Sequence, residues 1–193
     1  RKAAGILQIG IPSAFQYSLF AIANLFVQSS VNSFDHVLVE GNSAAANADP
    51  LVYDMMAAFY TACSSFIAQN FGAKKKKRIL QTYLICLFYS FITSLVLGVG
   101  LYLARYPFLY LFTSDKAVVE AGITRLSIMA LSYSVSAFMD ASIAASRGLG
   151  KTAVPTFVVV MGSCVFRIIW IYTIFAYFHT IQSLYILYIF LSL

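Results

Sequence analysis

Residues 79–104 read ILQTYLICLFYSFITSLVLGVGLYLA and contain no charged side chain. A helix needs roughly 20 apolar residues to cross the hydrocarbon core of a bilayer, and this run exceeds that length. Similar runs fill most of the 193-residue chain, which is 61% hydrophobic and 10% charged, with a mean hydropathy of +0.82. The composition excludes an ordinary water-soluble domain and predicts an all-α, polytopic membrane protein.

The apolar runs predict a single transmembrane helical lobe over residues 1–193. The spans are expected at approximately 6–31, 51–71 with an alternative start at 44, 79–104, 123–146, 152–178 and 184–193. The last run offers only about 10 residues, too few to cross a bilayer. We therefore expect a truncated sixth helix and a chain that is part of something longer.

Basic residues occur in three clusters: Arg1 with Lys2, residues 74–78, and Arg147 with Lys151. If each span crosses once, all three clusters lie on the same side, which the positive-inside rule assigns to the cytoplasm. We expect a multi-pass protein of the plasma (inner) membrane with cytoplasmic basic loops. The net charge of +6 then requires no nucleic-acid partner.

The sequence contains no arrangement typical of a metal site, a cofactor site or a catalytic centre. Cys63, Cys86 and Cys164 occur singly in three different spans, so neither zinc nor a disulfide framework is indicated. Residues 145–152 imitate a phosphate-binding loop, but Ala145 replaces its first glycine and an apolar helix precedes it. We expect no enzyme activity, no metal and no cofactor apart from a transported coupling ion.

Polar residues form stripes along one face of several predicted helices. At 100° per residue, Ser13, Tyr17, Asn24 and Gln28 fall within an arc of about 60°. Small and hydroxylated residues in such stripes are explained by helix packing. The third span has its polar residues mostly near its ends, so it is expected at the periphery, against lipid.

Packing does not explain Asp54, Asp140 and Arg167, because a charge inside a span costs at least ~2.5 kcal/mol on insertion scales. A role in transport or coupling and a role as a structural ion pair both remain open. By depth, Asp54 and Arg167 lie ~27 Å and ~22 Å from the cytoplasmic ends of their helices, and Asp140 only ~10 Å. We expect Arg167 to neutralise Asp54, leaving Asp140 free to take up a proton or cation.

Residues 106–115 behave differently from the spans. Pro107 is expected to break the third helix, and Thr113, Ser114 and Asp115 offer capping oxygens for a helix that begins near Lys116. A short amphipathic helix on the outer surface is the expected result.

The order of short motifs resembles the carboxy-terminal half, helices seven to twelve, of a prokaryotic-type multidrug and toxic compound extrusion (MATE) transporter. The motifs are Ile9-Gly-Ile-Pro12, Gln69-Asn-Phe-Gly-Ala73, Leu111-Phe-Thr-Ser-Asp115, Arg147-Gly-Leu-Gly-Lys-Thr152 and Arg167-Ile-Ile-Trp170. The resemblance implies one six-helix lobe of a twelve-helix antiporter that exports organic cations or other amphiphiles in exchange for protons or sodium. Residues 12–20 lack the buried glutamate of the sodium-coupled branch, and Asp140 is the available acid before the Arg-Gly turn.

The predicted function is therefore multidrug or organic-cation efflux, with the lipid bilayer and the missing amino-terminal lobe as partners. The predicted cavity wall consists of Gln16, Tyr17, Asn24, Gln28, Asp54 and Asp140. Two of these are carboxylates against the single arginine Arg167, so a slightly acidic wall and cationic cargo are expected. Two further functions stay open: a lipid-linked oligosaccharide flippase of the same superfamily, which needs more arginines or lysines in its cavity, and a non-transporting membrane scaffold.

Overall fold

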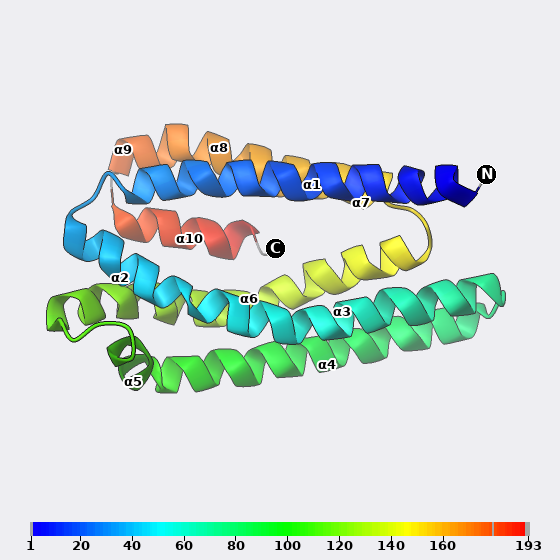
Figure 1. The fold of residues 1–193 in the computed structure, drawn as a ribbon, viewed down its shortest axis with the longest axis horizontal. Helices are drawn as coiled ribbons and strands as arrows, with labels where there is room; N and C mark the ends of the chain where they lie inside the picture. The colour runs from blue at the N-terminus through cyan, green and yellow to red at the C-terminus, as the bar shows by residue number, and fades with distance from the viewer. Residues whose placement is uncertain (1, 179, 192–193) are drawn as a thin grey trace.

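The computed structural model describes residues 2–178 and 180–191, and every regular element in this part of the chain is a helix (Figure 1). The elements are α1 (Lys2–Val31), α2 (His36–Ala46), α3 (Ala48–Gly72), α4 (Lys76–Leu103), α5 (Arg105–Tyr110), α6 (Lys116–Gly148), α7 (Ala153–Val159), η1 (Val160–Val165), α8 (Phe166–Trp170), η2 (Ile171–Phe175), α9 (Ala176–Phe178) and α10 (Ile181–Leu191).

The helices form two groups that lie roughly parallel (Figure 1). In one group α3, α4 and α6 pack closely against one another, with α2 and α5 beside α6. In the other, α1 packs against α7, η1 and α8, and α10 contacts both this group and α6. A pocket lies between the two groups, with α1 on one side and α3 and α6 on the other.

The helix α4 lies at the edge of the molecule, as its apolar sequence predicts (Figure 1). Its buried residues recur every four positions: Cys86, Ser90, Ser94 and Gly98. These small residues let α4 approach α6 closely, because a Cβ on Gly98 would overlap the carbonyl oxygen of Ala130. The large side chains of its other faces, such as Leu84 and Phe88, are exposed.

The segment around the second predicted span contains two helices instead of one. Residues 36–72 together are apolar enough to cross a membrane, but the helix is interrupted at Asn47. The Asn47 side-chain amide donates to the carbonyl oxygens of Ser43 and Ala44, each at 3.1 Å, and so satisfies the end of α2. Pro50 is the third residue of α3, in the first turn, where a helix tolerates a missing N–H.

The third predicted span is the helix α4, which ends at Leu103. Pro107 follows this end and lies in the first turn of α5. Asp115 caps the next helix as predicted, its Oδ1 accepting from the backbone N–H of Ala117 at 2.8 Å. That helix is not a separate surface element, because α6 continues to Gly148 with a bend of 43° between Ala130 and Ser132. Its first half is buried through Val119 and Leu126 against α2 and α5.

The fifth span alternates between α-helix and π-helix. Two π-helical stretches, η1 and η2, flank the short α8, which carries Arg167. Stretches of π-helix shift the register of the side chains and are frequent at functional sites. Trp170 ties α8 to α10 by donating its indole N–H to the carbonyl oxygen of Ser183 at 3.0 Å.

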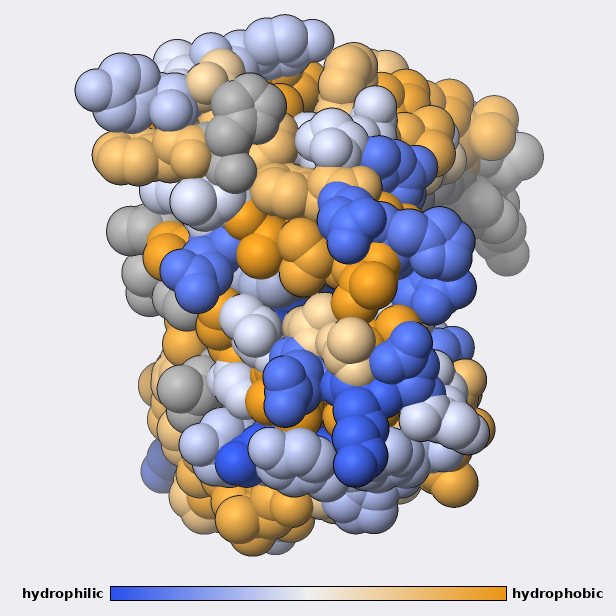
Figure 2. Space-filling view, turned by 90° about the vertical axis from the view of Figure 1, so that its left-hand side faces the viewer, coloured by the Kyte–Doolittle hydropathy of each residue, from blue (hydrophilic) through white to orange (hydrophobic). Residues whose placement is uncertain are grey.

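The surface has the pattern of a membrane protein. Four helical segments of the described chain are long and apolar enough to cross a bilayer, or five if the two halves of α6 count as one span. Figure 2 views the end of the molecule where α2, α5 and α9 lie, and hydrophilic residues gather on this end while hydrophobic residues flank it. The apolar sides and polar ends match the layering of a bilayer.

Candidate functional site

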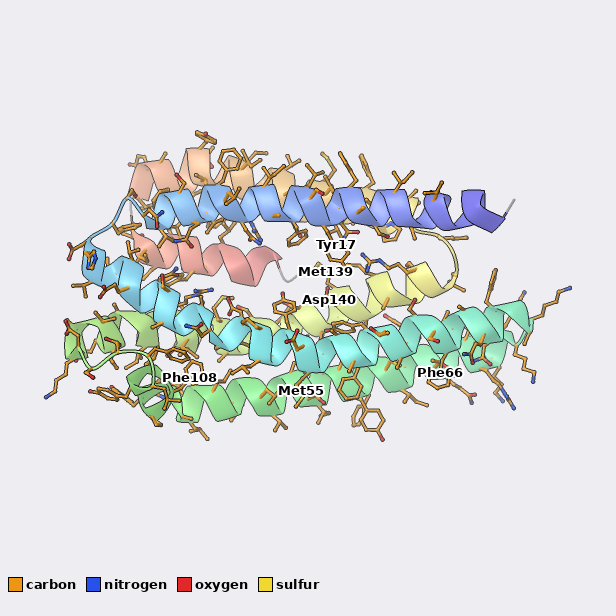
Figure 3. All side chains as sticks on the ribbon, in the orientation of Figure 1. Tyr17, Met55, Phe66, Phe108, Met139 and Asp140 are labelled. Atoms are coloured by element: carbon orange, nitrogen blue, oxygen red, sulfur yellow. The ribbon has the colours of Figure 1, made fainter. Side chains whose placement is uncertain are left out.

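A cavity of about 1090 Å³ lies between the two helix groups. Its wall includes residues of α1, α2, α3, α6, α8 and α10. Figure 3 shows Tyr17 on α1 and Asp140 on α6 facing the space between these helices. A cavity of this size accommodates a drug-sized molecule.

Most of the predicted cavity residues line this space. Those on its wall are Gln16, Tyr17, Asn24, Gln28 and Asp140, together with Arg167. Leu25 and Ile11, on other faces of α1, are exposed and do not line the cavity. The structure therefore brings together polar side chains of α1, α6 and α8.

Asp54 does not line the cavity and is exposed to the outside of the described lobe. The α3 residues that do line the cavity include Tyr53, Ala57, Thr61, Ser64 and Ser65. The structure thus removes Asp54 from the cavity wall and from its expected place beside Arg167.

Arg167 is 3% exposed and bonds to α1. Its Nη1 donates a hydrogen bond to Oδ1 of Asn24, and its guanidinium lies over the ring of Phe20 at 5.5 Å. A buried guanidinium needs such acceptors and aromatic faces to offset its loss of hydration. Arg167 therefore links the fifth span to α1 along the cavity.

Arg147 makes a second bridge between the helix groups. From the last turn of α6 it donates to Tyr17 Oη at 3.2 Å and to Gln16 Oε1 at 3.3 Å, and it lies 5.4 Å from the Tyr17 ring centroid. Thr156 of α7 donates to the same Gln16 oxygen at 3.2 Å. This cluster joins α1, α6 and α7 at the end of the cavity next to the α6–α7 turn.

Asp140 lies half-buried on the cavity wall two turns before Arg147. Its Oδ2 is buried and accepts no hydrogen bond from the residues that the structure describes. The buried hydroxyl of Tyr60, another wall residue, likewise has no partner in the described chain. A carboxylate oxygen left unpaired beside a cavity is placed to bind a proton, a cation or a cargo group.

A network at the other end of the cavity was not predicted. Arg125 of α6 forms an ion pair with Asp49 of α3 at 2.6 Å, and Tyr133 donates to the second oxygen of the same carboxylate. Arg125 also donates to the carbonyl oxygen of Asn42 at 2.7 Å. The apolar runs alone place Arg125 and Asp49 at the outer ends of their spans, so nothing in those runs indicates that the two residues pair. The signal that could have found them is the cap at Asp115, which puts Arg125 ten residues inside a helix.

The family model MatE matches residues 12–173. The chain belongs to the MatE family. This match confirms the resemblance to MATE transporters. Members of this family are transporters and not enzymes. They move small molecules across a lipid bilayer.

Solved MATE structures share the fold over nearly the whole chain. A point mutant of a MATE protein matches with a TM-score of 0.87 at 19% identity, covering 97% of this chain and 42% of that one. A transporter of the MOP superfamily from Pyrococcus furiosus, described as having a binding pocket of reverse polarity, matches with a TM-score of 0.82 at 17% identity. The match covers 97% of this chain and 41% of that one. The all-α fold of one MATE lobe is confirmed.

A FAD transporter from Shewanella oneidensis is 25% identical over 115 residues, which are 60% of this chain and 25% of that protein. The chain thus spans well under half the length of the MATE relatives it matches. What the whole protein carries is therefore a matter of proposal.

The charge of this MATE lobe's cavity differs from the expectation. The charged residues on its described wall are Asp49, Asp140, Arg125, Arg147 and Arg167. Three arginines against two carboxylates give the wall a formal charge of +1. The expected slightly acidic wall is wrong, because Asp54 lies outside the cavity while Arg125 and Arg147 lie on it.

Proposed function

We propose that this chain is the carboxy-terminal lobe of a secondary active exporter that exchanges small amphiphilic molecules for protons or sodium ions. The observation that carries this proposal is Asp140, whose buried carboxylate oxygen lies unpaired on the wall of a drug-sized cavity. An amino-terminal lobe of the same protein closes the cavity, and the two lobes rock against each other to alternate access. The protein sits in the plasma (inner) membrane with its basic loops in the cytoplasm.

Asp140 is the proposed coupling residue. An ionised side chain inside a membrane span is costly unless it meets water, an ion or an opposite charge, so it responds strongly to what enters the cavity. Arg147 lies on the same face of α6 and supplies a cation near it. We propose that uptake of a proton or sodium ion at Asp140 excludes the binding of a cationic cargo group at the same carboxylate.

Two classes of cargo fit different parts of the wall. Organic cations, the class predicted from sequence, would be held by Asp140 and by the aromatic rings of Tyr17, Phe20, Tyr53 and Tyr60. Molecules that combine aromatic rings with phosphate groups would use the same rings and the three arginines. The net positive wall favours the second class, as does the relative that is a FAD transporter.

A lipid-linked oligosaccharide flippase would also need a cationic cavity. A flippase is expected to have more arginines or lysines in its cavity than Arg167 alone, and the three arginines on this cavity wall meet that expectation. The MatE match favours a MATE exporter over a flippase. A non-transporting scaffold, in contrast, would neither bind nor move cargo, so a transport assay separates it from both.

The test uses the full-length transporter in proteoliposomes with an imposed proton or sodium gradient. Uptake of FAD and of the fluorescent cation ethidium is measured for the parent protein, Asp140→Asn and the matched control Asp54→Asn. We expect gradient-driven uptake that Asp140→Asn abolishes and Asp54→Asn retains, with FAD preferred to ethidium. Coupled transport by Asp140→Asn at the parent rate contradicts the coupling role, and transport of neither probe favours the scaffold.

A further inference from the structure

The loop between α3 and α4 concentrates positive charge at the end of two apolar helices. Residues 74–78 are four lysines and one arginine, and the sequence contains no acidic residue between positions 55 and 114. All five side chains are exposed. In the described chain none of them forms an ion pair.

The turn that presents these residues is well ordered by hydrogen bonds. The backbone N–H groups of Lys74 and Lys75 donate to the carbonyl oxygens of Phe71 and Asn70 at 3.0 and 2.9 Å. Lys74 has a φ of 57°, which reverses the chain within one residue. The basic side chains therefore project from a fixed turn, and Figure 3 shows nitrogen-tipped side chains extending from this end of the α3–α4 pair.

A shallow hollow of about 450 Å³ lies among these side chains. It is lined by Lys75, Lys76, Lys77, Arg78 and Gln81. Lysine and arginine side chains donate hydrogen bonds and carry no acceptor, so a ligand that satisfies the hollow must be anionic and rich in acceptor oxygens. Phosphate has both properties.

The surroundings of the hollow distinguish a lipid from a soluble anion. Lys76, Leu80 and Leu84 follow one another at intervals of four residues, so they form one stripe on α4. Leu80 and Leu84 are 59% and 53% exposed, and the apolar stripe begins about 6 Å from the lysine. A phospholipid has a charged headgroup directly joined to acyl chains, which matches this sequence of basic and apolar surface.

We infer that the 74–78 loop and the first turns of α4 form a docking surface for anionic phospholipid headgroups. The phosphate lies among Lys75, Lys76, Lys77 and Arg78, and the acyl chains lie along Leu80 and Leu84. Juxtamembrane clusters of four to eight basic residues attract anionic lipids in this way. The surface lies outside the transport cavity and does not depend on which cargo the protein carries.

Native mass spectrometry of the full-length transporter tests this inference. The purified protein is titrated with phosphatidylglycerol or phosphatidylcholine, and bound lipids are counted. Each lysine near an anionic surface contributes about a fivefold gain in affinity, so Lys75→Gln/Lys77→Gln should weaken phosphatidylglycerol binding about 30-fold. Phosphatidylcholine binding should not change.

Three controls complete the experiment. Lys116→Gln/Lys151→Gln removes the same charge from exposed positions elsewhere and should bind phosphatidylglycerol like the parent. Lys75→Arg/Lys77→Arg keeps the charge and should bind normally, and Lys77→Gln alone should lose about fivefold if the double variant folds poorly. Equal binding by parent and Lys75→Gln/Lys77→Gln overturns the inference. So does an equal loss in the Lys116/Lys151 control, or displacement of the lipid by millimolar inorganic phosphate.

Discussion

Arg125 on α6 and Asp49 on α3 form an ion pair of 2.6 Å, although they are far apart in the sequence. Arg125 is 6% exposed, and Tyr133 donates to the other oxygen of the same carboxylate. A carboxylate held by a guanidinium and a phenol is a strong tie between two helices, because both of its oxygens are satisfied by charge-assisted hydrogen bonds. This tie fixes α3 against both halves of α6, because Arg125 precedes the bend in that helix and Tyr133 follows it.

Asp49→Ala should destabilise the protein by about 3 kcal/mol, because it leaves Arg125 buried without its carboxylate. The measurement is thermal unfolding of the full-length transporter in detergent. Asp54→Ala removes a carboxylate that forms no ion pair in the described chain, five residues along the same helix, and should not lower stability. Identical unfolding temperatures for the two variants would refute the structural role of the ion pair.

Two glycines of α4 should respond oppositely to alanine. A Cβ on Gly98 would overlap the Ala130 carbonyl oxygen, whereas a Cβ on Gly100 would have no neighbour within 4 Å. Gly98→Ala should therefore push α4 from α6 and lower stability by about 1–3 kcal/mol, the usual range for overpacking. Gly100→Ala should be neutral or raise stability by up to about 1 kcal/mol through helix propensity. Thermal unfolding measures both, and tolerance of Gly98→Ala would contradict the close contact.

Cysteine labelling should place the basic loops on one side of the membrane. Cys63, Cys86 and Cys164 are buried, so they give a low background for a membrane-impermeant maleimide. Lys75→Cys and Lys151→Cys should label only from the cytoplasmic side, and Lys116→Cys only from the outside. Labelling of positions 75 and 151 from opposite sides would refute the predicted topology.

Arg147→Gln should shift cargo preference from anions toward cations. It removes one positive charge from a wall with a formal charge of +1. A unit charge about 10 Å from the cargo contributes roughly 1.7 kcal/mol at an effective dielectric constant near 20, which is more than tenfold in the ratio of FAD to ethidium uptake. Arg147→Lys keeps the charge and should keep the preference, although it cannot bind Gln16 and Tyr17 with one planar group. An unchanged ratio in Arg147→Gln would show that this arginine does not select cargo.

The stripe of polar residues on α1 shows how far a sequence can predict a site. Tyr17, Asn24 and Gln28 share one face of a continuous helix, so their common exposure to the cavity follows from helical geometry alone. On α3 the same reasoning failed for Asp54. On that helix Asp49 and Tyr53 make the contacts to α6, whereas Asp54 is exposed.

Local sequence was enough to establish that the chain is helical and apolar, where Asp115 caps α6, and that the third span lies at the edge. These properties depend on side chains within a few positions of each other and on the length of each apolar run. Tertiary packing determined which partner each arginine of the cavity wall binds. Arg125 with Asp49, Arg147 with Gln16 and Arg167 with Asn24 each join residues distant in sequence, and helix rotation and bending place them within bonding distance. The sign of the cavity's charge depends on those placements, because Arg125 and Arg147 line the wall whereas Asp54 does not.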